Sequence, residues 1–139
     1  LKRIIFFQNR QSKKSGENRS LILGGPLDGK YELWQFHAHW GNEDGHGSEH
    51  TVDGKNYAAE LHLMHWNKKY GTPDIAVDKP DGLSVLGMLI EVGEKRHQEF
   101  DKVVQALNKI PCKDDKTSLE GAAIDCANFL PEDKVKLVS

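Results

Sequence analysis

The sequence predicts a β-dominated α+β fold in a chain of 139 residues. Residues 35–40 alternate polar and apolar side chains, as a strand with one buried face does, and residues 60–65 follow the same two-residue period. Residues 100–110 instead place apolar side chains at the spacing of one helix face. One helical segment among several strand-like segments favours a domain built on a sheet.

The first elements follow from local signals along the chain. Residues 1–8 and 21–23 are expected to form strands, and the segment 9–19, rich in Ser, Lys and Gly, is expected to be a loop. Gly24, Gly25 and Pro26 then predict a turn. These elements lead into the two alternating segments.

The alternating segments extend to expected strands over 31–40 and 58–67, joined by a connection that contains several glycines. Residues 85–92 are apolar enough to predict a buried strand. Pro111 is expected to end the helix over 100–110, because proline cannot continue the helical hydrogen bonds. No element is assigned to residues 113–120 or 122–137.

The composition is typical of a soluble globular domain, with 37% hydrophobic residues, 29% charged residues and a formal net charge of −2. Lysines and arginines are dispersed, which argues against nucleic-acid binding, and no apolar run approaches the length of a membrane span. Cys112 and Cys126 lack a metal-binding spacing and mildly favour the reducing cytoplasm. Secretion stays open, because the sequence does not begin with methionine.

Three histidines form the pattern that bears most directly on function. Alternation puts His37 and His39 on one face of the first strand and His62 on one face of the second, whereas His65 points to the opposite face. On neighbouring strands the three imidazoles would converge on one Zn²⁺ and leave its fourth tetrahedral position open. That arrangement is typical of a catalytic zinc site.

Each strand also carries a hydrogen-bond acceptor two residues before a histidine, on the same face. Gln35 is expected to accept the ring N–H of His37, and Glu60 is expected to accept that of His62. Such contacts fix which ring nitrogen faces a metal. They therefore strengthen the zinc interpretation over a chance pair of histidines.

Motifs along most of the chain resemble those of the α-class carbonic anhydrases. They are GGPL at 24–27, QFHAHWG at 35–41, GSEHTVD at 47–53, YAAELHLMHWN at 57–67 and PDGLSVLG at 80–87. The resemblance implies a zinc enzyme that interconverts carbon dioxide and bicarbonate by attack of a zinc-bound hydroxide, with His37, His39 and His62 as ligands. It also implies inhibition by sulfonamides and anions, and a twisted, mostly antiparallel sheet with a few surface helices.

The same resemblance gives Glu49 a catalytic role, because the family's glutamate at this place accepts a hydrogen bond from a threonine that orients the hydroxide. The family's threonine segment does not appear before Ser139, so residues 1–139 are expected to be a single partial domain without the family's C-terminal strands. Met64 and Val85 are expected to line the apolar wall beside which carbon dioxide binds. Core packing is the commoner role of such side chains.

The remaining histidines have no predicted catalytic role. His46 and His97 are expected to lie in solvated segments, whereas His50 and His65 are expected to be hydrogen-bonded structural residues beneath the site. No histidine precedes His37, although active family members carry their proton-shuttling histidine in that region.

Two rival functions stay open at this point. One is a zinc-binding or interaction domain of carbonic anhydrase ancestry without turnover, which the lack of the threonine segment favours. The other is a cupin metal site, for which Glu43 has a suitable spacing. His50 argues against it, because the cupin motif needs glycine at that place.

Overall fold

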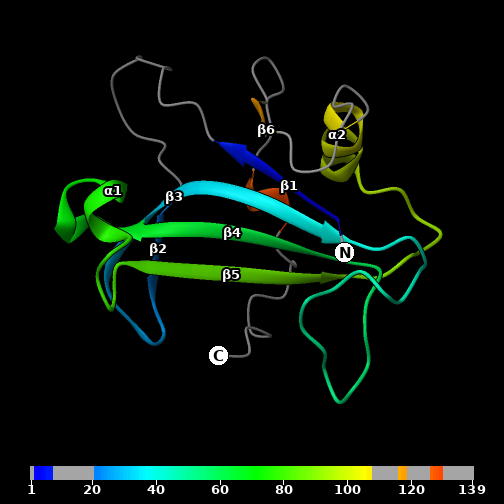
Figure 1. The fold of residues 1–139 in the computed structure, drawn as a ribbon, viewed down its shortest axis with the longest axis horizontal. Helices are drawn as coiled ribbons and strands as arrows, with labels where there is room; N and C mark the ends of the chain where they lie inside the picture. Colours follow the sequence, from blue (N-terminus) through cyan, green and yellow to red (C-terminus); the bar gives the residue numbers. More distant parts are fainter. Residues whose placement is uncertain (1, 8–20, 108–115, 119–125, 130–139) are drawn as a thin grey trace.

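The described part of the chain is built on a six-stranded sheet (Figure 1). The computed structural model describes residues 2–7, 21–107, 116–118 and 126–129. The strands are β1 (Lys2–Phe7), β2 (Leu21–Gly24), β3 (Leu27–Trp40), β4 (Ala59–Asn67), β5 (Leu83–Ile90) and β6 (Lys116–Ser118). They lie in the order β5-β4-β3-β1-β6, and β2 pairs with β3. Every pairing is antiparallel except that of β1 with β6, so the predicted fold class is confirmed.

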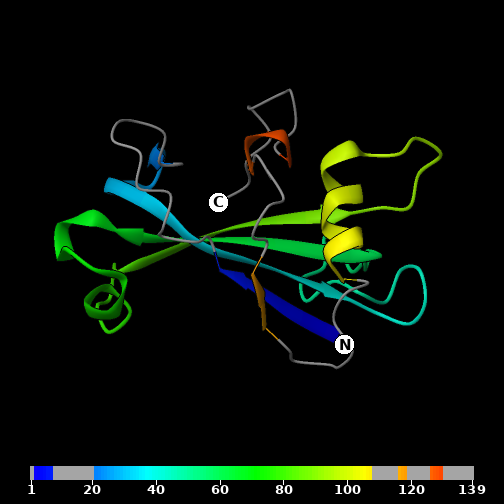
Figure 2. The same cartoon turned by 90° about the horizontal axis from the view of Figure 1, so that it is seen from above.

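Short helices flank the sheet. They are the 3-10 helix η1 (Lys68–Tyr70), α1 (Pro73–Ala76), α2 (Gln98–Leu107) and the 3-10 helix η2 (Cys126–Phe129). Figure 2 shows α2 and η2 on the same side of the twisted sheet. α1 begins where the Thr72 hydroxyl accepts the N–H of Ile75 at 3.4 Å and Pro73 takes the first helical position. Within the described ranges no helix is long and apolar enough to cross a membrane.

The apolar face of β3 and β4 forms the core, against which α2 and η2 pack. Its buried members are Leu33, Phe36, Ala38, Leu61, Leu63, Val103 and Phe129. The Phe129 ring lies 5.0 Å from the Phe100 ring and 6.4 Å from the Phe36 ring, measured between centroids, which ties both helices to the sheet. Because successive side chains of a strand alternate, the opposite face of β3 and β4 carries their polar residues.

A β-bulge interrupts β3 at Trp34. Leu33 and Gln35, two residues apart on β3, pair with the consecutive residues 65 and 64 of β4. The bulge allows Leu33 to join the core, although unbroken alternation would place it on the same face as Gln35. From Gln35 to Trp40 the two-residue period is intact.

Several expected elements are confirmed with shifted ends. The strands expected over 1–8 and 21–23 correspond to β1 and β2, while the strand expected over 31–40 begins earlier, at Leu27. The helix expected over 100–110 begins at Gln98. The expectations for 9–19, Pro111 and Cys112 lie outside the described residues, as does the side chain of Cys126.

β5 corrects the prediction of a buried strand over 85–92. It spans Leu83–Ile90 and lies at one end of the strand order, and Val85 is 49% exposed. Burial of a strand depends on its neighbours in the sheet, which its own apolar sequence does not encode. The short strand β6 was not expected either, since its three polar residues pair with β1 and show no apolar alternation.

Candidate metal centre

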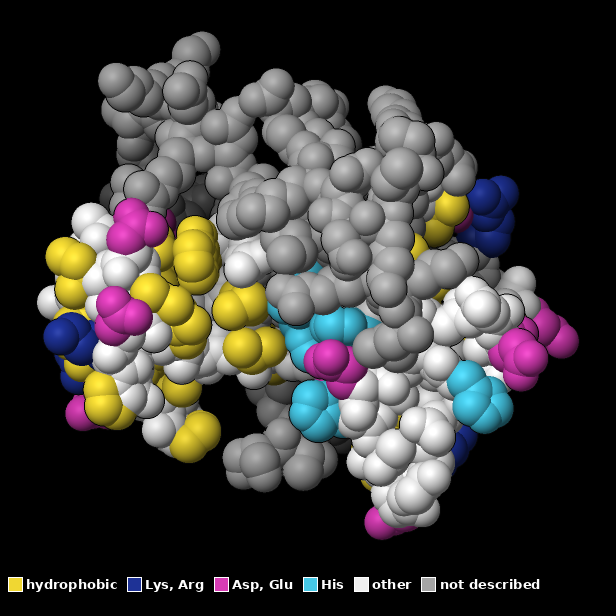
Figure 3. Space-filling view, viewed as in Figure 1, with side chains coloured by type: hydrophobic (Ala, Val, Ile, Leu, Met, Phe, Trp, Pro, Cys, Tyr) yellow, Lys and Arg dark blue, Asp and Glu magenta, His cyan; other side chains and the backbone are white. Residues whose placement is uncertain are grey.

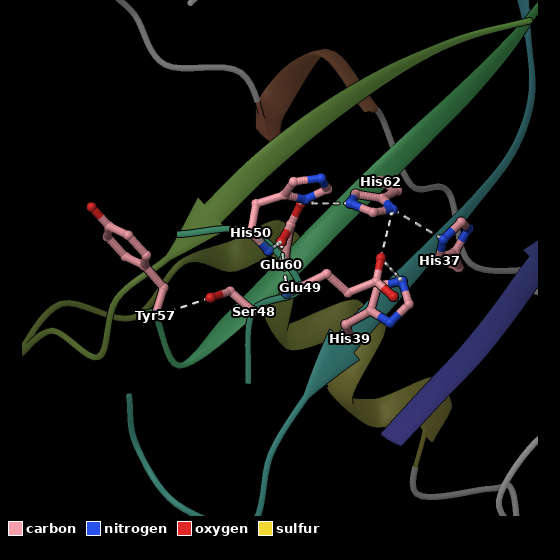
Figure 4. Close-up of polar contacts among 8 residues, drawn as sticks. All are labelled: His37, His39, Ser48, Glu49, His50, Tyr57, Glu60 and His62. Carbon is pink, nitrogen blue, oxygen red and sulfur yellow. Dashed lines mark hydrogen bonds and ion pairs between the residues drawn. The ribbon is translucent and has the colours of Figure 1, made fainter. Parts of the chain in front are cut away.

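Three histidine side chains meet on the polar face of β3 and β4 (Figure 4). His37 and His39 come from β3, and His62 comes from β4, directly opposite His37. One ring nitrogen of each lies within 4.8 Å of the others, and Nε2 of His37 is 3.2 Å from Nδ1 of His62. All three residues are buried, with exposed fractions of 5%, 2% and 7%. Neighbouring strands thus bring together the three histidines that alternation placed on one face.

This set of donors fits Zn²⁺. Imidazole nitrogen is a common zinc ligand, and a catalytic zinc site has three protein ligands and a fourth position for another group. The three rings lie edge to face at 62° to 79°, with centroids 5.0 Å apart, so they do not stack. A cation bound by all three rings would also replace the hydrogen bonds to water that these buried polar groups lose on folding.

Glu60 holds His62 in one tautomer. Its Oε1 accepts a hydrogen bond from Nε2 of His62 at 2.6 Å, so the ring proton lies on Nε2 and Nδ1 faces His37. Glu60 is only 2% exposed. Burial by itself would raise the pKa of its carboxyl, but hydrogen bonds from the His50 main chain and from the His62 and His50 rings lower that pKa to about 2. The carboxylate that contacts His62 is therefore ionised, and it belongs to Glu60, the residue that the sequence predicts as the partner of His62.

Residues 47–50 form a loop that is fixed against the start of β4. The N–H groups of Gly47 and Ser48 both donate to the Tyr57 carbonyl, at 2.9 and 3.1 Å, and the Tyr57 N–H donates to Oγ of Ser48 at 3.0 Å. A Cβ at Gly47 would lie 1.8 Å from the carbonyl oxygen of Ala58, so only glycine permits this approach. The loop is therefore positioned by main-chain contacts and by the Ser48 hydroxyl.

Glu49 reaches the histidines from this loop. Oε2 of Glu60 accepts the N–H groups of Glu49 and His50, at 2.9 and 2.8 Å, and so holds the main chain beside the metal centre. Oε2 of Glu49 lies 3.3 Å from Nε2 of His39 and 4.0 Å from Nδ1 of His62. The sequence associated Glu49 with the site, but it gave no indication of contact with the ring nitrogens.

Gly87 of β5 is a residue of the site that the sequence analysis missed. It lies opposite His62, and a Cβ there would lie 3.3 Å from Oε1 of Glu60. The bare main chain therefore leaves room for the Glu60–His62 hydrogen bond. A glycine inside an apolar strand segment marks such a close approach and was the available signal. Ser48 and Tyr57 were also missed, because their contacts involve main-chain atoms.

Gln35 is the residue that the sequence predicts as the hydrogen-bond acceptor of His37. It lies buried on β3, 8% exposed, but its Oε1 accepts no hydrogen bond from the residues that the structure describes. Orientation of His37 by Gln35 remains a prediction.

Met64 and Val85 pair across β4 and β5 beside the histidines. Alternation places Met64 on the same face as Glu60 and His62. Met64 is half-buried and Val85 is 49% exposed. Figure 3 shows hydrophobic side chains next to the histidines on this face. An apolar surface therefore adjoins the metal centre, and its use by carbon dioxide remains a prediction.

The other described histidines do not belong to the group formed by His37, His39 and His62. His65 is buried, donates from Nδ1 to the carbonyl two residues before it at 3.0 Å, and has a pKa lowered by burial. His46 and His97 are exposed, as expected. His50 corrects the prediction that it lies beneath the site. It does bond to Glu60, but its side chain is 73% exposed, so it lies at the edge of the site.

A mostly antiparallel sheet that carries three converging, buried imidazoles is typical of a zinc-binding domain with an open metal position. The chain belongs to the eukaryotic-type carbonic anhydrase family, whose model matches residues 7–137. Carbonic anhydrase 3 of Rattus norvegicus and that of Mus musculus are each 54% identical to it over 96 residues, and that of Homo sapiens is 53% identical. Each match covers 69% of this chain and 36% of the relative, so the chain spans about a third of those relatives.

Proposed function

We propose that the chain binds Zn²⁺ through His37, His39 and His62 and catalyses the reversible hydration of carbon dioxide to bicarbonate and a proton. The convergence of three buried ring nitrogens carries this proposal, because three imidazole ligands leave a position for a reacting group. Membership of the carbonic anhydrase family supports the choice of reaction.

The chain's own residues hold and orient the metal. When bound, zinc would lower the pKa of a water molecule to about 7, the value known for the carbonic anhydrases as a family, and so would supply a nucleophile at neutral pH. The two histidines of β3 and the one of β4 supply the ligand nitrogens. Glu60 keeps Nδ1 of His62 available by accepting the proton on Nε2 at 2.6 Å.

The apolar surface beside the histidines is the proposed binding place for the substrate. Carbon dioxide has no net dipole, so an apolar surface can hold it beside the reacting group. Met64 and Val85, paired across β4 and β5, offer that contact next to His62. Glu49, whose Oε2 lies 4.0 Å from Nδ1 of His62, is the proposed acceptor of a hydrogen bond from the reacting water.

Sulfonamides and inorganic anions are the proposed inhibitors of the site. Both offer an anionic atom to the fourth metal position, which the three histidines leave for a ligand other than imidazole. Their binding would block the same position that the reaction uses.

A second candidate is a zinc-binding domain without turnover. The contact of Glu49 with His39 and His62, at 3.3 and 4.0 Å, favours this alternative, because a carboxylate so close to the ring nitrogens competes for the fourth position. Both candidates share the zinc site and differ in whether that position opens to substrate.

The initial rate of carbon dioxide hydration decides between the candidates. It is measured by stopped flow with a pH indicator on the zinc-loaded and the chelator-stripped chain, with His62→Ala as the control that loses a ligand. A zinc-dependent rate above buffer that His62→Ala abolishes supports the enzyme. A folded chain that holds one zinc without such a rate supports the domain without turnover, and a folded chain that binds no zinc contradicts both.

A further inference from the structure

The two methionines of the chain lie on neighbouring strands but on opposite faces of the sheet. Met88 of β5 pairs with the fully buried Leu61 and packs against the hydrophobic core, on the side that α2 and η2 cover. Met64 of β4 pairs with Val85, which is 49% exposed, on the face that carries His62. A small solute therefore meets the sulfur of Met64 more readily than that of Met88.

The thioether of methionine is a group that peroxides oxidise. Its sulfur attacks one oxygen of hydrogen peroxide, an S–O bond forms and the O–O bond breaks. The hydroxide that leaves takes the proton of the transferred oxygen and becomes water. The sulfur loses two electrons, which the peroxide gains. An apolar, flexible side chain thus becomes a polar and chiral sulfoxide, and methionine sulfoxide reductases reverse the change.

Gln35 gives an oxidised Met64 a hydrogen-bond partner. The two residues pair across β3 and β4, where the Cβ atoms of opposite residues lie about 4.5 to 5.5 Å apart. Gln35 is 8% exposed, and its Oε1 accepts no hydrogen bond from the residues that the structure describes. That oxygen is the predicted acceptor for His37, and the N–H groups of the same amide can donate to a sulfoxide oxygen. Such a bond would keep the oxidised side chain on this face of the folded sheet.

We propose that Met64 is a peroxide-sensitive residue and that its oxidation to the sulfoxide weakens the binding of apolar ligands at the metal centre. This inference rests on the proposed function, because Met64 belongs to the surface on which carbon dioxide would bind. An apolar ligand that covers the sulfoxide takes a polar group out of water, which is unfavourable. A ligand that contacts only the metal does not meet this cost. Oxidation therefore acts on the apolar surface and not on the three histidines.

Peptide mass analysis after treatment with hydrogen peroxide tests the order of oxidation. The folded, zinc-loaded chain is treated for increasing times, and the gain of one oxygen atom is followed at each methionine. Met64 is expected to be oxidised before Met88. The urea-unfolded chain is the control, because both sulfurs are then exposed and should react at similar rates. Equal rates in the folded chain, or faster oxidation of Met88, would overturn the proposal.

Two probes of different polarity test the effect on the metal centre. Dansylamide carries an aromatic ring beside its zinc-binding nitrogen, whereas azide is a small anion without an apolar part. Oxidation is expected to weaken dansylamide binding by about fivefold or more, the lower end of the usual cost of burying a polar group. Azide affinity, measured by displacement of dansylamide, should stay unchanged. Methionine sulfoxide reductases A and B, which each reduce one epimer, should restore dansylamide binding.

Met64→Leu is the matched variant, because leucine is apolar, of similar size and without sulfur. It retains Met88 and both cysteines, so any effect of peroxide on those residues is common to the variant and the unchanged chain. Peroxide is expected to leave the dansylamide affinity of Met64→Leu at its untreated value. Met88→Leu should lose affinity on treatment as the unchanged chain does.

Other outcomes also overturn the proposal, and they are distinguishable. Unchanged dansylamide affinity after complete oxidation of Met64 means that the sulfoxide does not affect the site. An equal loss in Met64→Leu means that another residue is responsible, and an equal loss of azide affinity means that the metal centre itself is damaged. If the folded, untreated chain binds no zinc, the proposed function fails and the effect on the site fails with it, whereas the peptide masses still report which methionine reacts. Far-ultraviolet circular dichroism separates loss of binding from loss of folding.

Discussion

Glu60 and His62 lie two residues apart on β4, and the buried carboxylate of Glu60 accepts the Nε2 proton of His62 at 2.6 Å. The same carboxylate accepts the main-chain N–H groups of Glu49 and His50. The Glu60 side chain therefore fixes the tautomer of the His62 ring, and it also holds the loop that brings the Glu49 carboxylate to the histidines. Loss of Glu60 would disturb two parts of the site at once.

Glu60→Ala is expected to weaken zinc retention by about 10 to 100-fold, the usual effect of removing a hydrogen-bond partner of a ligand histidine. The rate of zinc release to a chelator measures it. Glu43→Ala, at an exposed acid of the connection between β3 and β4, is the control and should release zinc like the unchanged chain. Equal release rates for Glu60→Ala and the unchanged chain would contradict the orienting role of Glu60.

His62→Ala is expected to abolish stoichiometric zinc binding, whereas His65→Ala should destabilise the fold and still bind zinc. The two residues lie on opposite faces of β4, and only His62 belongs to the group of converging nitrogens. Zinc content after gel filtration, measured on folded protein, compares them. Equal loss of zinc in both variants would contradict the assignment of faces.

Gly87→Ala is expected to lower zinc affinity with a small effect on folding. The added methyl group would lie 3.3 Å from Oε1 of Glu60, tighter than an ordinary contact, and would push the carboxylate away from His62. Competition with a zinc-binding dye measures the affinity. Ser84→Ala, on the same strand, is the control for a change in β5 that adds no atoms beside Glu60. Unchanged affinity in Gly87→Ala would mean that the carboxylate moves without effect on the metal.

His65 is expected to make the stability of the chain depend on pH. Burial lowers its pKa in the folded protein below the ordinary value of 6.5, so it contributes stability above pH 6.5 that is lost as pH falls toward the folded pKa. Urea unfolding of the metal-free chain above and below pH 6.5 measures this loss. His65→Gln cannot titrate and should lose less stability over that interval, while the other histidines remain common to both proteins. Equal losses would show that His65 does not contribute.

The two-residue period of strands was enough to predict which histidines converge. His37, His39 and His62 lie on the face that alternation assigned to them, and His65 lies on the other. The period succeeds here because β3 and β4 pair without irregularity from Gln35 onward. It also identified Glu60 as a neighbour of His62, since residues two apart share a face.

Properties that depend on tertiary neighbours could not be predicted in the same way. The exposure of Val85 follows from the position of β5 at the end of the strand order. The placement of Glu49 follows from hydrogen bonds of the loop main chain to Tyr57 and to the Glu60 carboxylate, and which main-chain groups meet is not encoded in a local pattern. The bulge at Trp34, which brings Leu33 into the core, has no signal in the sequence.

The bulge at Trp34 has a consequence for how β3 tolerates changes of length. A residue gained or lost before Trp34 would alter the side chains that enter the core near Leu33. The bulge at Trp34 separates that end of the strand from the histidines and can take up the change in register. The same change between His37 and His39 would turn one of them to the apolar face and remove a ligand. Variation in length is therefore tolerable in β3 before Trp34, because the bulge keeps the pairing register of the metal-binding end unchanged.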